Sequence, residues 1–566
     1  MSEHIIFIFC IYFFIYSTIG FGEIFVRTVN KDLNICNIGY KGLIGFFFIS
    51  VISQVTIFFS PHDYVHNIIL HVFGLFGFFL FIKNKKNNYE FKFLSYLILI
   101  FLIGAYVYKN HDDFSYYHLT YTLNLSENRF IIGTGSFSHG FRTFSSLFYY
   151  HSILYLPYIK FYLFHIGPFL ILVFFNFIIC KDLLKAAKIK KVNFLFYYKI
   201  LILIFVNIVF YRIGEHGTDR SAQILLLLIF LLFFDLIFEN KNKQEVILKT
   251  SLLLILIFMA SSMKAIYYMY LILIPIVLIK NFLLKKFLVK KNILFIFILL
   301  LSISTNLITN YFNTGCFLYP SEKTCIGKRV WSIPKEEVKK MRNHYEWWSK
   351  AGGGPGYVSE LKSDVYIKNF NWVKNWINRH FFNKVSDTLL GTLLICTIVI
   401  ITYKLKVKKR RENNFNYLKF LIAILLPIIF LIEWFLNHPA MRYGGYVLIA
   451  LPLIIFSSCY LEKIIIDKKK LFNTTTIFIL ISISIFFSRN LIRINKEINF
   501  YNYDIISSPF FYVENIDSEI IAVNQNLKIY SPINKTTCWA SKTPCSYSKK
   551  LKLDRFLGLN VVYKYD

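Results

Sequence analysis

Long apolar stretches, separated by shorter polar connections, dominate the pattern of this chain. Each stretch is long enough to cross about 30 Å of hydrocarbon as a helix. The pattern therefore predicts an all-α polytopic membrane protein with about fourteen transmembrane helices. The predicted spans are roughly 4–26, 42–60, 64–82, 91–109, 159–180, 192–212, 221–239, 248–262, 264–282, 292–312, 385–403, 417–437, 441–460 and 472–490.

The stretches between these spans differ greatly in length, and this difference predicts the organisation of the chain. The expected parts are a four-helix segment (1–109), a long first outer loop (110–158), a central six-helix segment (159–312), a large second outer loop (313–384), a four-helix segment (385–490) and an outer tail (491–566). In the first outer loop, the spacing of aromatic residues predicts interfacial helices, one of them over 144–157. Short alternating runs in the tail predict a small folded appendage.

Basic residues decide the predicted orientation. The chain has 64 Lys and Arg against 32 Asp and Glu, a net charge of +32. Seven alternate connections hold 31 of the basic residues, whereas the short connections of the other side hold four. By the positive-inside rule the first set is cytoplasmic, so both termini and the three long segments are predicted outside. The orientation in the membrane thus accounts for the excess of basic residues, and we expect no nucleic-acid partner.

Tryptophan and cysteine support the same orientation. All seven Trp lie in outer segments or at the outer ends of spans, at positions 331, 347, 348, 372, 376, 434 and 539. Cys316 and Cys325 share one outer segment, and Cys538 and Cys545 share another. Because disulfides persist on the oxidising side of a membrane, these spacings predict two bonds, 316–325 and 538–545. The alternative is four free thiols.

Ionisable side chains near the outer surface are the candidates for chemistry, because charge in or beside a span is costly. Asp112 and Asp113 repel each other and gain no evident packing, so one of them is a candidate general base. The further candidates for substrate binding are His118, Arg142, Arg212, Glu215, His216, Asp219, Arg220, Lys264 and Arg442.

Each of these candidates also has a structural interpretation. Arg442 and Lys264 are placed where long side chains reach from helix ends toward water, and residues 212–220 are able to form an ion-pair network within a tight loop. No metal-site, phosphate-loop or dinucleotide fingerprint is present in the sequence. We therefore predict no metal site and no cofactor, and the need for a divalent metal stays open.

Several short motifs together resemble the GT-C class of integral membrane glycosyltransferases, and more closely an uncharacterised group of bacterial multi-pass proteins with GT-C-like features. An acidic pair follows an early span and opens a long outer loop, although here three extra spans come first. The matching pieces are Asp112-Asp113 with Tyr117-His118, Gly135, Arg142-Thr-Phe-Ser-Ser146, Thr314-Gly-Cys-Phe-Leu-Tyr-Pro-Ser321, Trp331-Ser-Ile-Pro334, Arg442-Tyr443-Gly444, Cys538-Trp539 and Pro544-Cys545.

The resemblance implies a glycosyltransferase of the bacterial cytoplasmic membrane. It would move a sugar from a polyprenyl-phosphate-linked donor in the outer leaflet to an envelope glycan or lipid acceptor. Asp112 or Asp113 would deprotonate the acceptor hydroxyl, and outer cations would neutralise the departing phosphate. Two alternatives remain open at this point: a polymerase of lipid-linked oligosaccharide repeats, which should rely on arginines, and a non-enzymatic transporter or flippase.

The predicted orientation is tested by reporter fusions. Fusions within 405–412 should report the cytoplasm, since the densest run of basic residues lies there. Fusions within 345–356 should report the outside. The reverse result would overturn every placement given above.

Overall fold

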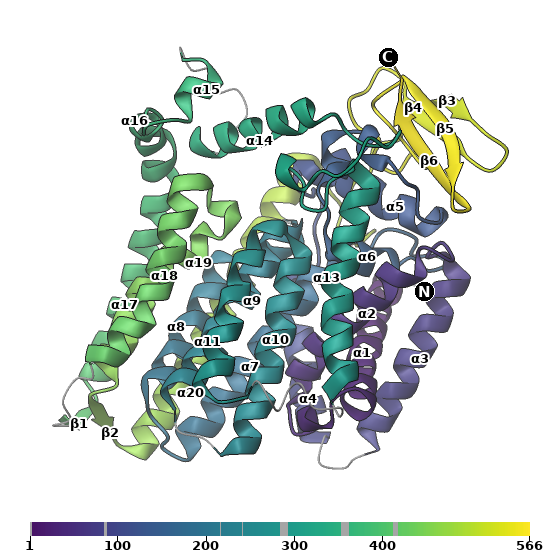
Figure 1. Cartoon of the computed structure of the whole chain (residues 1–566). Helices are drawn as coiled ribbons and strands as arrows, with labels where there is room; N and C mark the ends of the chain where they lie inside the picture. Colours follow the sequence, from purple (N-terminus) through teal and green to yellow (C-terminus); the bar gives the residue numbers. More distant parts are fainter. Residues whose placement is uncertain are drawn as a thin grey trace.

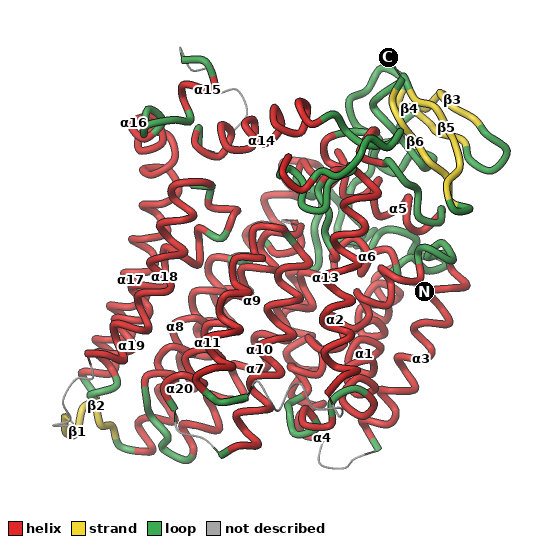
Figure 2. Tube along the Cα trace, in the orientation of Figure 1, coloured by secondary structure: helices red, strands yellow, loops and turns green. Residues whose placement is uncertain are grey.

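The computed structural model describes residues 3–83, 88–215, 217–239, 242–283, 292–352, 361–410 and 417–565 (Figure 1). The chain is 69% helical and 6% strand. Most helices run side by side as one bundle, and Figure 2 shows that the strands of the described residues lie in two places, at opposite ends of it. The protein is thus an all-helical membrane bundle with small additions at its ends.

Among the described residues, ten helical runs are long and apolar enough to cross a membrane. They are α1 (Glu3–Thr28), α2 (Ile38–Thr56), α3 (Tyr64–Ile82), α7 (Ile166–Lys188), α9 (Gly217–Phe238), α10 (Lys243–Met263), α13 (Ile293–Thr314), α16, η11 and α17 together (Val373–Trp376, Ile377–Val385 and Ser386–Lys404), α18 (Tyr417–Asn437) and α20 (Lys468–Tyr501).

The other four predicted spans fall on shorter helices, so the described residues contain ten candidate crossings and fourteen stays a prediction. The shorter helices are α4 (Asn88–Phe101), α8 (Phe194–Val209), η8 with α11 (Ala265–Ile272 and Leu273–Lys280) and α19 (Gly445–Leu461). After α4 the chain continues as a short 3-10 helix to Gly104, where an added Cβ would lie 2.8 Å from the ring of Phe486.

Glycines allow the first three helices to pack backbone against backbone. A Cβ atom added at Gly20 of α1 would lie 1.7 Å from the carbonyl oxygen of Gly74 in α3. A Cβ atom at Gly45 of α2 would lie 1.8 Å from the carbonyl oxygen of Thr18 in α1. Small residues at helix contacts are typical of membrane bundles, where close packing drives association.

The three long segments gather at one end of the bundle, uppermost in Figure 1. They contribute η4 (Phe114–His118), α5 (Leu119–Glu127), η5 (Thr134–Ser136), η6 (His139–Arg142), α6 (Ser146–Ser152), α14 (Lys335–Lys350), α15 (Ser363–Tyr366), β3 (Ser518–Val523), β4 (Lys528–Pro532), β5 (Leu551–Phe556) and β6 (Leu559–Lys564). At the opposite end, β1 (Val407–Arg410) pairs with β2 (Ile464–Ile466).

The tail folds as two antiparallel hairpins, β3–β4 and β5–β6. It is also hydrogen-bonded to the first long loop. The Ile132 carbonyl accepts a hydrogen bond from the Val562 N–H of β6 at 2.8 Å, and the Ile132 N–H donates to the Asn560 carbonyl of β6 at 2.9 Å. Disulfides join Cys316 to Cys325 and Cys538 to Cys545, the two pairs that the sequence predicts. The tail is thus a folded appendage held against the loop.

One local expectation differs from the structure. Residues 144–157 do not form a single helix lying in an interface. Only Ser146–Ser152 is helical, and all seven of its residues are buried because α6 packs between α2 and α5. The aromatic spacing there serves the protein interior rather than the lipid surface.

The glycine contact gives a prediction for stability. Gly20→Ala should lower the free energy of unfolding by about 1–3 kcal/mol, because the added methyl group forces α1 and α3 apart. Gly391→Ala, in the exposed flank of α17, is the matched control, since nothing lies within 4 Å of its added Cβ. Unfolding midpoints in detergent would measure both, and equal midpoints would contradict the packing described here.

Candidate functional site

A cavity of about 620 Å³ opens at the end of the bundle where the long segments gather. Its walls come from the first long loop, the start of η8, the underside of α14 and the end of α18 with η12 (Met441–Tyr443). Aromatic side chains form much of the lining, and they include Tyr117, Tyr268, Tyr319, Tyr345, Trp348 and Tyr443. Volume and lining suit a small polar organic ligand rather than a single ion.

Four charged side chains from four parts of the chain meet beside this cavity. The Arg442 guanidinium donates through Nη2 to Asp113 at 2.9 Å and through Nε to Asp219 at 2.7 Å. Lys264 donates to the other carboxylate oxygen of Asp219. The charges of this quartet cancel. Asp219 is its centre, because it alone contacts both cations.

Local structure explains how these residues meet. Asp219 lies in the first turn of α9, where the exposed N–H groups favour a carboxylate. Lys264 follows the last residue of α10 in extended conformation and turns the chain into η8. Arg442 lies in η12, which ends at Gly444 with φ at +96°, a value that favours glycine. The quartet therefore depends on helix ends rather than helix faces.

The quartet also sets the proton affinity of Asp113. Burial by itself would raise the pKa of this carboxyl group, but Arg442, His118 and His111 hold the pKa below its ordinary value. Asp113 is 27% exposed, and its contact with Arg442 is direct. It is therefore an ionised group that accepts hydrogen bonds readily and takes up protons weakly.

The two adjacent aspartates have different surroundings. Asp112 is 88% exposed, does not line the cavity, and has Lys109 at 3.5 Å. Asp113 lines the cavity. The structure thus separates the pair that the sequence presents together.

Three of the candidate arginines are held by other protein groups. Arg142 donates to the Gly135 carbonyl at 2.9 Å and to Glu337 of α14 at 2.6 Å. Arg212 is paired with Glu215. Arg220 stacks on the ring of Tyr446, 4.3 Å from its centre. Each already has a structural partner, and none of the three lines the cavity.

The charged residues of the loop between α8 and α9 do not form a single ion-pair network. Glu215 pairs with Arg212 and, at 3.4 Å, with Arg493 of α20, whereas Asp219 belongs to the quartet. His216 lies outside the described residues. The residues 212–220 therefore serve two separate clusters.

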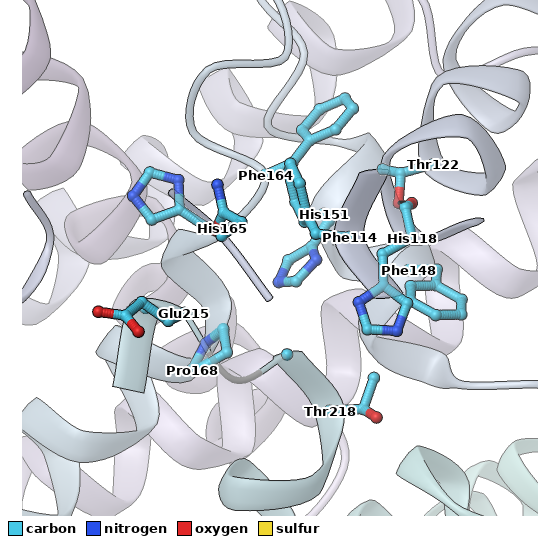
Figure 3. Close-up of a pocket in the computed structure, with 13 residues that line it drawn as sticks. Phe114, His118, Thr122, Phe148, His151, Phe164, His165, Pro168, Glu215 and Thr218 are labelled. Atoms are coloured by element: carbon cyan, nitrogen blue, oxygen red, sulfur yellow. Dashed lines mark hydrogen bonds between the residues drawn. The ribbon is translucent and has the colours of Figure 1, made fainter. Parts of the chain in front are cut away.

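His118 lines a second, much smaller chamber of about 10 Å³ (Figure 3). In that view His151 lies between His165 and His118, and the Glu215 carboxylate points away from the three rings. Nε2 of His118 and Nε2 of His151 are buried without a hydrogen-bond partner among the described residues. The chamber has the space of about one water molecule, so it cannot admit a substrate.

Several cavity residues were not selected from the sequence. Arg342, His344 and Glu346 come from α14, whose polar composition marks only a surface helix. Arg342 forms no ion pair within the described ranges. Trp348 lies under the Arg442 guanidinium, 5.6 Å from its carbon. The nearest signal in the sequence is the run of Trp and basic residues, which is equally typical of a membrane interface.

Metal binding has no evident site in the described part of the chain. No group of three or more His, Cys, Asp or Glu side chains there is arranged to hold an ion. The cavity instead offers carboxylates, cations and aromatic rings.

Comparison with known proteins gives one match. A family model described as "Domain of unknown function (DUF8201)" matches residues 4–449. These residues include the first long loop, α14 and the whole charged quartet. No curated protein and no solved structure matches this chain.

The buried histidines predict a pH dependence of stability. Burial lowers the pKa of His118 from 6.5 to about 4, and does the same for His165. As the pH falls below about 6.5, the unfolded chain takes up protons that the folded chain refuses until about 4, so the folded state loses stability over this window. Unfolding midpoints measured from about pH 7.5 down to about pH 5 should fall. His118→Phe should fall less steeply, and a level profile in the unaltered protein would contradict the neutral buried rings.

Proposed function

This chain belongs to the DUF8201 family, whose description assigns no activity, and we propose from its site that it is a membrane glycosyltransferase. The proposed reaction moves a sugar from a polyprenyl-phosphate-linked donor to an envelope glycan or lipid acceptor. We place it at the outer face of a bacterial cytoplasmic membrane, as the basic connections and the GT-C resemblance imply.

One observation carries the proposal: a large aromatic cavity with both carboxylates and cations lies at the end of a bundle of membrane-spanning helices. Aromatic rings such as Trp348 and Tyr345 offer flat apolar faces, which suit the C–H faces of a sugar ring. Carboxylates and amides such as Asn310 and Asn437 offer partners for hydroxyl groups. A lipid-linked donor would bring its head group to this depth while its chain stays in the bilayer.

The cavity narrows the roles that the resemblance implies. Of the two outer-loop aspartates, only Asp113 lines the cavity, so any part that the acidic pair plays there is assigned to Asp113. Lys264 and Arg442 share the two aspartates of the quartet, so neither brings excess positive charge. Arg342 is the cavity cation left to neutralise a phosphate.

The proposed chemistry is a single displacement. An acceptor hydroxyl oxygen attacks the anomeric carbon while the bond from that carbon to the phosphate oxygen breaks, and the configuration is inverted. The electron pair of the broken bond leaves with the phosphate. A carboxylate in the cavity takes the acceptor's proton.

Two neighbouring aspartates allow a controlled test. Asp113→Asn should lower transfer by about tenfold or more, because it removes a cavity carboxylate and releases one arm of Arg442. Asp112→Asn should transfer as the wild type does, since Asp112 is exposed outside the cavity. Envelope glycan composition is compared at matched membrane expression.

Other outcomes would favour other functions. Full transfer by both single variants and by the double variant would overturn a role for the outer-loop carboxylates. Loss of long glycan chains with unchanged linkage of single sugars would favour the polymerase alternative. Unchanged composition, with altered movement of a lipid-linked sugar across the membrane, would favour the transporter.

A further inference from the structure

Three carboxylates line the large cavity, and two of them are already neutralised. Asp113 is paired with Arg442 at 2.9 Å. Glu346 of α14 is paired with Lys350, one helical turn away, at 2.6 Å. A carboxylate in contact with a cation prefers its charged form, which makes it a poor acceptor of a proton.

Glu433 is the third of these carboxylates, and its surroundings are different. It lies on α18, one turn before the helix ends at Asn437. Its Oε1 atom accepts a hydrogen bond from the Asn437 amide at 3.2 Å. Its Oε2 atom is buried and has no hydrogen-bond partner among the described residues. No Lys, Arg or His within the described ranges lies in ion-pair distance of it.

The position of Glu433 fits a task at the cavity. A carboxylate on a membrane-spanning helix is costly and needs a reason. Asn437 does not remove that cost, because a single amide contact leaves one oxygen without a partner. A structural carboxylate in this protein looks different, as Asp219 shows by binding two cations.

We propose that Glu433 is the group that takes the proton from the acceptor hydroxyl in this cavity, and that Asp113 is a positioning residue that holds Arg442. This assignment rests on the glycosyltransfer proposed above and names its proton acceptor. It moves the base from the outer loop, where the sequence places it, to the end of α18.

The step balances as follows. The acceptor oxygen forms its bond to the anomeric carbon and gives its proton to Oε2 of Glu433. The bond between the anomeric carbon and the phosphate oxygen breaks, and the lipid phosphate leaves with that electron pair. Glu433 ends the step protonated and returns the proton to water through the open cavity.

Other titratable groups near Glu433 compete poorly for the proton. Burial lowers the pKa of His438 to about 4. Tyr270 of η8 and Tyr443 of η12 are phenols, and Lys264 is held by Asp219. On the facing helix α14, Arg342 and His344 have exposed side chains, and Glu346 is bound by Lys350.

The test compares Glu433→Gln, Glu433→Asp and a matched control, Glu336→Gln. Glu336 is an exposed glutamate of α14 that does not line the cavity. Each protein is purified in detergent and assayed with a polyprenyl-phosphate-linked hexose labelled in its sugar, with extracted envelope glycan as acceptor. Both kcat and kcat/KM are measured against pH, together with the unfolding midpoint.

We expect Glu433→Gln to lower kcat by about 100-fold to 10,000-fold and to abolish the fall of kcat/KM at acid pH. Glu433→Asp should recover part of kcat, and Glu336→Gln should behave as the wild type. The unfolding midpoint of Glu433→Gln should not fall, because the amide keeps the Asn437 contact and removes an uncompensated charge. Asp113→Asn should melt lower, since it leaves Arg442 partly unpaired.

The outcomes separate the two proposals. Transfer by Glu433→Gln at the wild-type rate and with the wild-type pH profile would overturn the role of Glu433 and leave the glycosyltransferase intact. A midpoint lowered as far as that of Asp113→Asn would show a structural carboxylate and would also overturn that role. Absence of transfer by the unaltered protein would overturn the proposed function itself, and the role of Glu433 with it.

Discussion

The site depends on the ion pairs that the buried carboxylate of Asp219 makes with two cations. The carboxylate binds Lys264 and Arg442, which lie in segments far apart in the sequence. Removing one partner from a buried charge pair costs roughly 3–5 kcal/mol, because the remaining charge is left uncompensated in an apolar place. The ends of α9 and α10 and the η12 turn are therefore held together by one side chain. Asp113 of the first long loop joins them through Arg442.

This contact changes the meaning of the outer cations. From the sequence, the basic residues outside the cytoplasmic connections are free charges at a surface that a phosphate would approach. In the structure, Arg142, Arg212 and Arg220 each have a partner, and the two cations of the quartet share two aspartates. Among the described residues, the one arginine or lysine that lines the cavity outside the quartet is Arg342, and it comes from α14 rather than from the helix ends that carry the quartet.

The sequence predicts the helical architecture well, because the lipid bilayer requires long apolar stretches that form helices. Each of the fourteen apolar stretches overlaps a helix, and both cysteine pairs are disulfides, since span length and cysteine placement are local properties of the chain. The number of crossings is less certain from pattern alone. Just after the short α4 helix, Gly104 lies against the ring of Phe486 in α20, and a contact between residues so far apart is not a local property of the chain.

The site was predicted only in part for the same reason. Asp113, Asp219, Lys264 and Arg442 are recognisable as costly charges near a surface. Their pairing with one another is not recognisable, because pairing depends on how helix ends meet.

His118 shows the same limit. Its place beside Asp113 in the motif suggests the cavity, yet its ring faces the small chamber with His151. Glu433 lies near the end of the predicted span 417–437, and nothing in the neighbouring sequence indicates that it lacks a cation.

The separation of paired from unpaired carboxylates follows from the demands of the proposed reaction. A departing lipid phosphate needs cations, and any carboxylate in contact with those cations loses affinity for protons. A single cluster therefore cannot serve well both as phosphate site and as base. In this cavity Arg342 of α14 is the cation left for the phosphate, while Glu433 lies on α18 with one amide contact and no cation in ion-pair distance among the described residues. Because the cation for the phosphate and the proton acceptor lie on different walls, one cavity can serve both tasks.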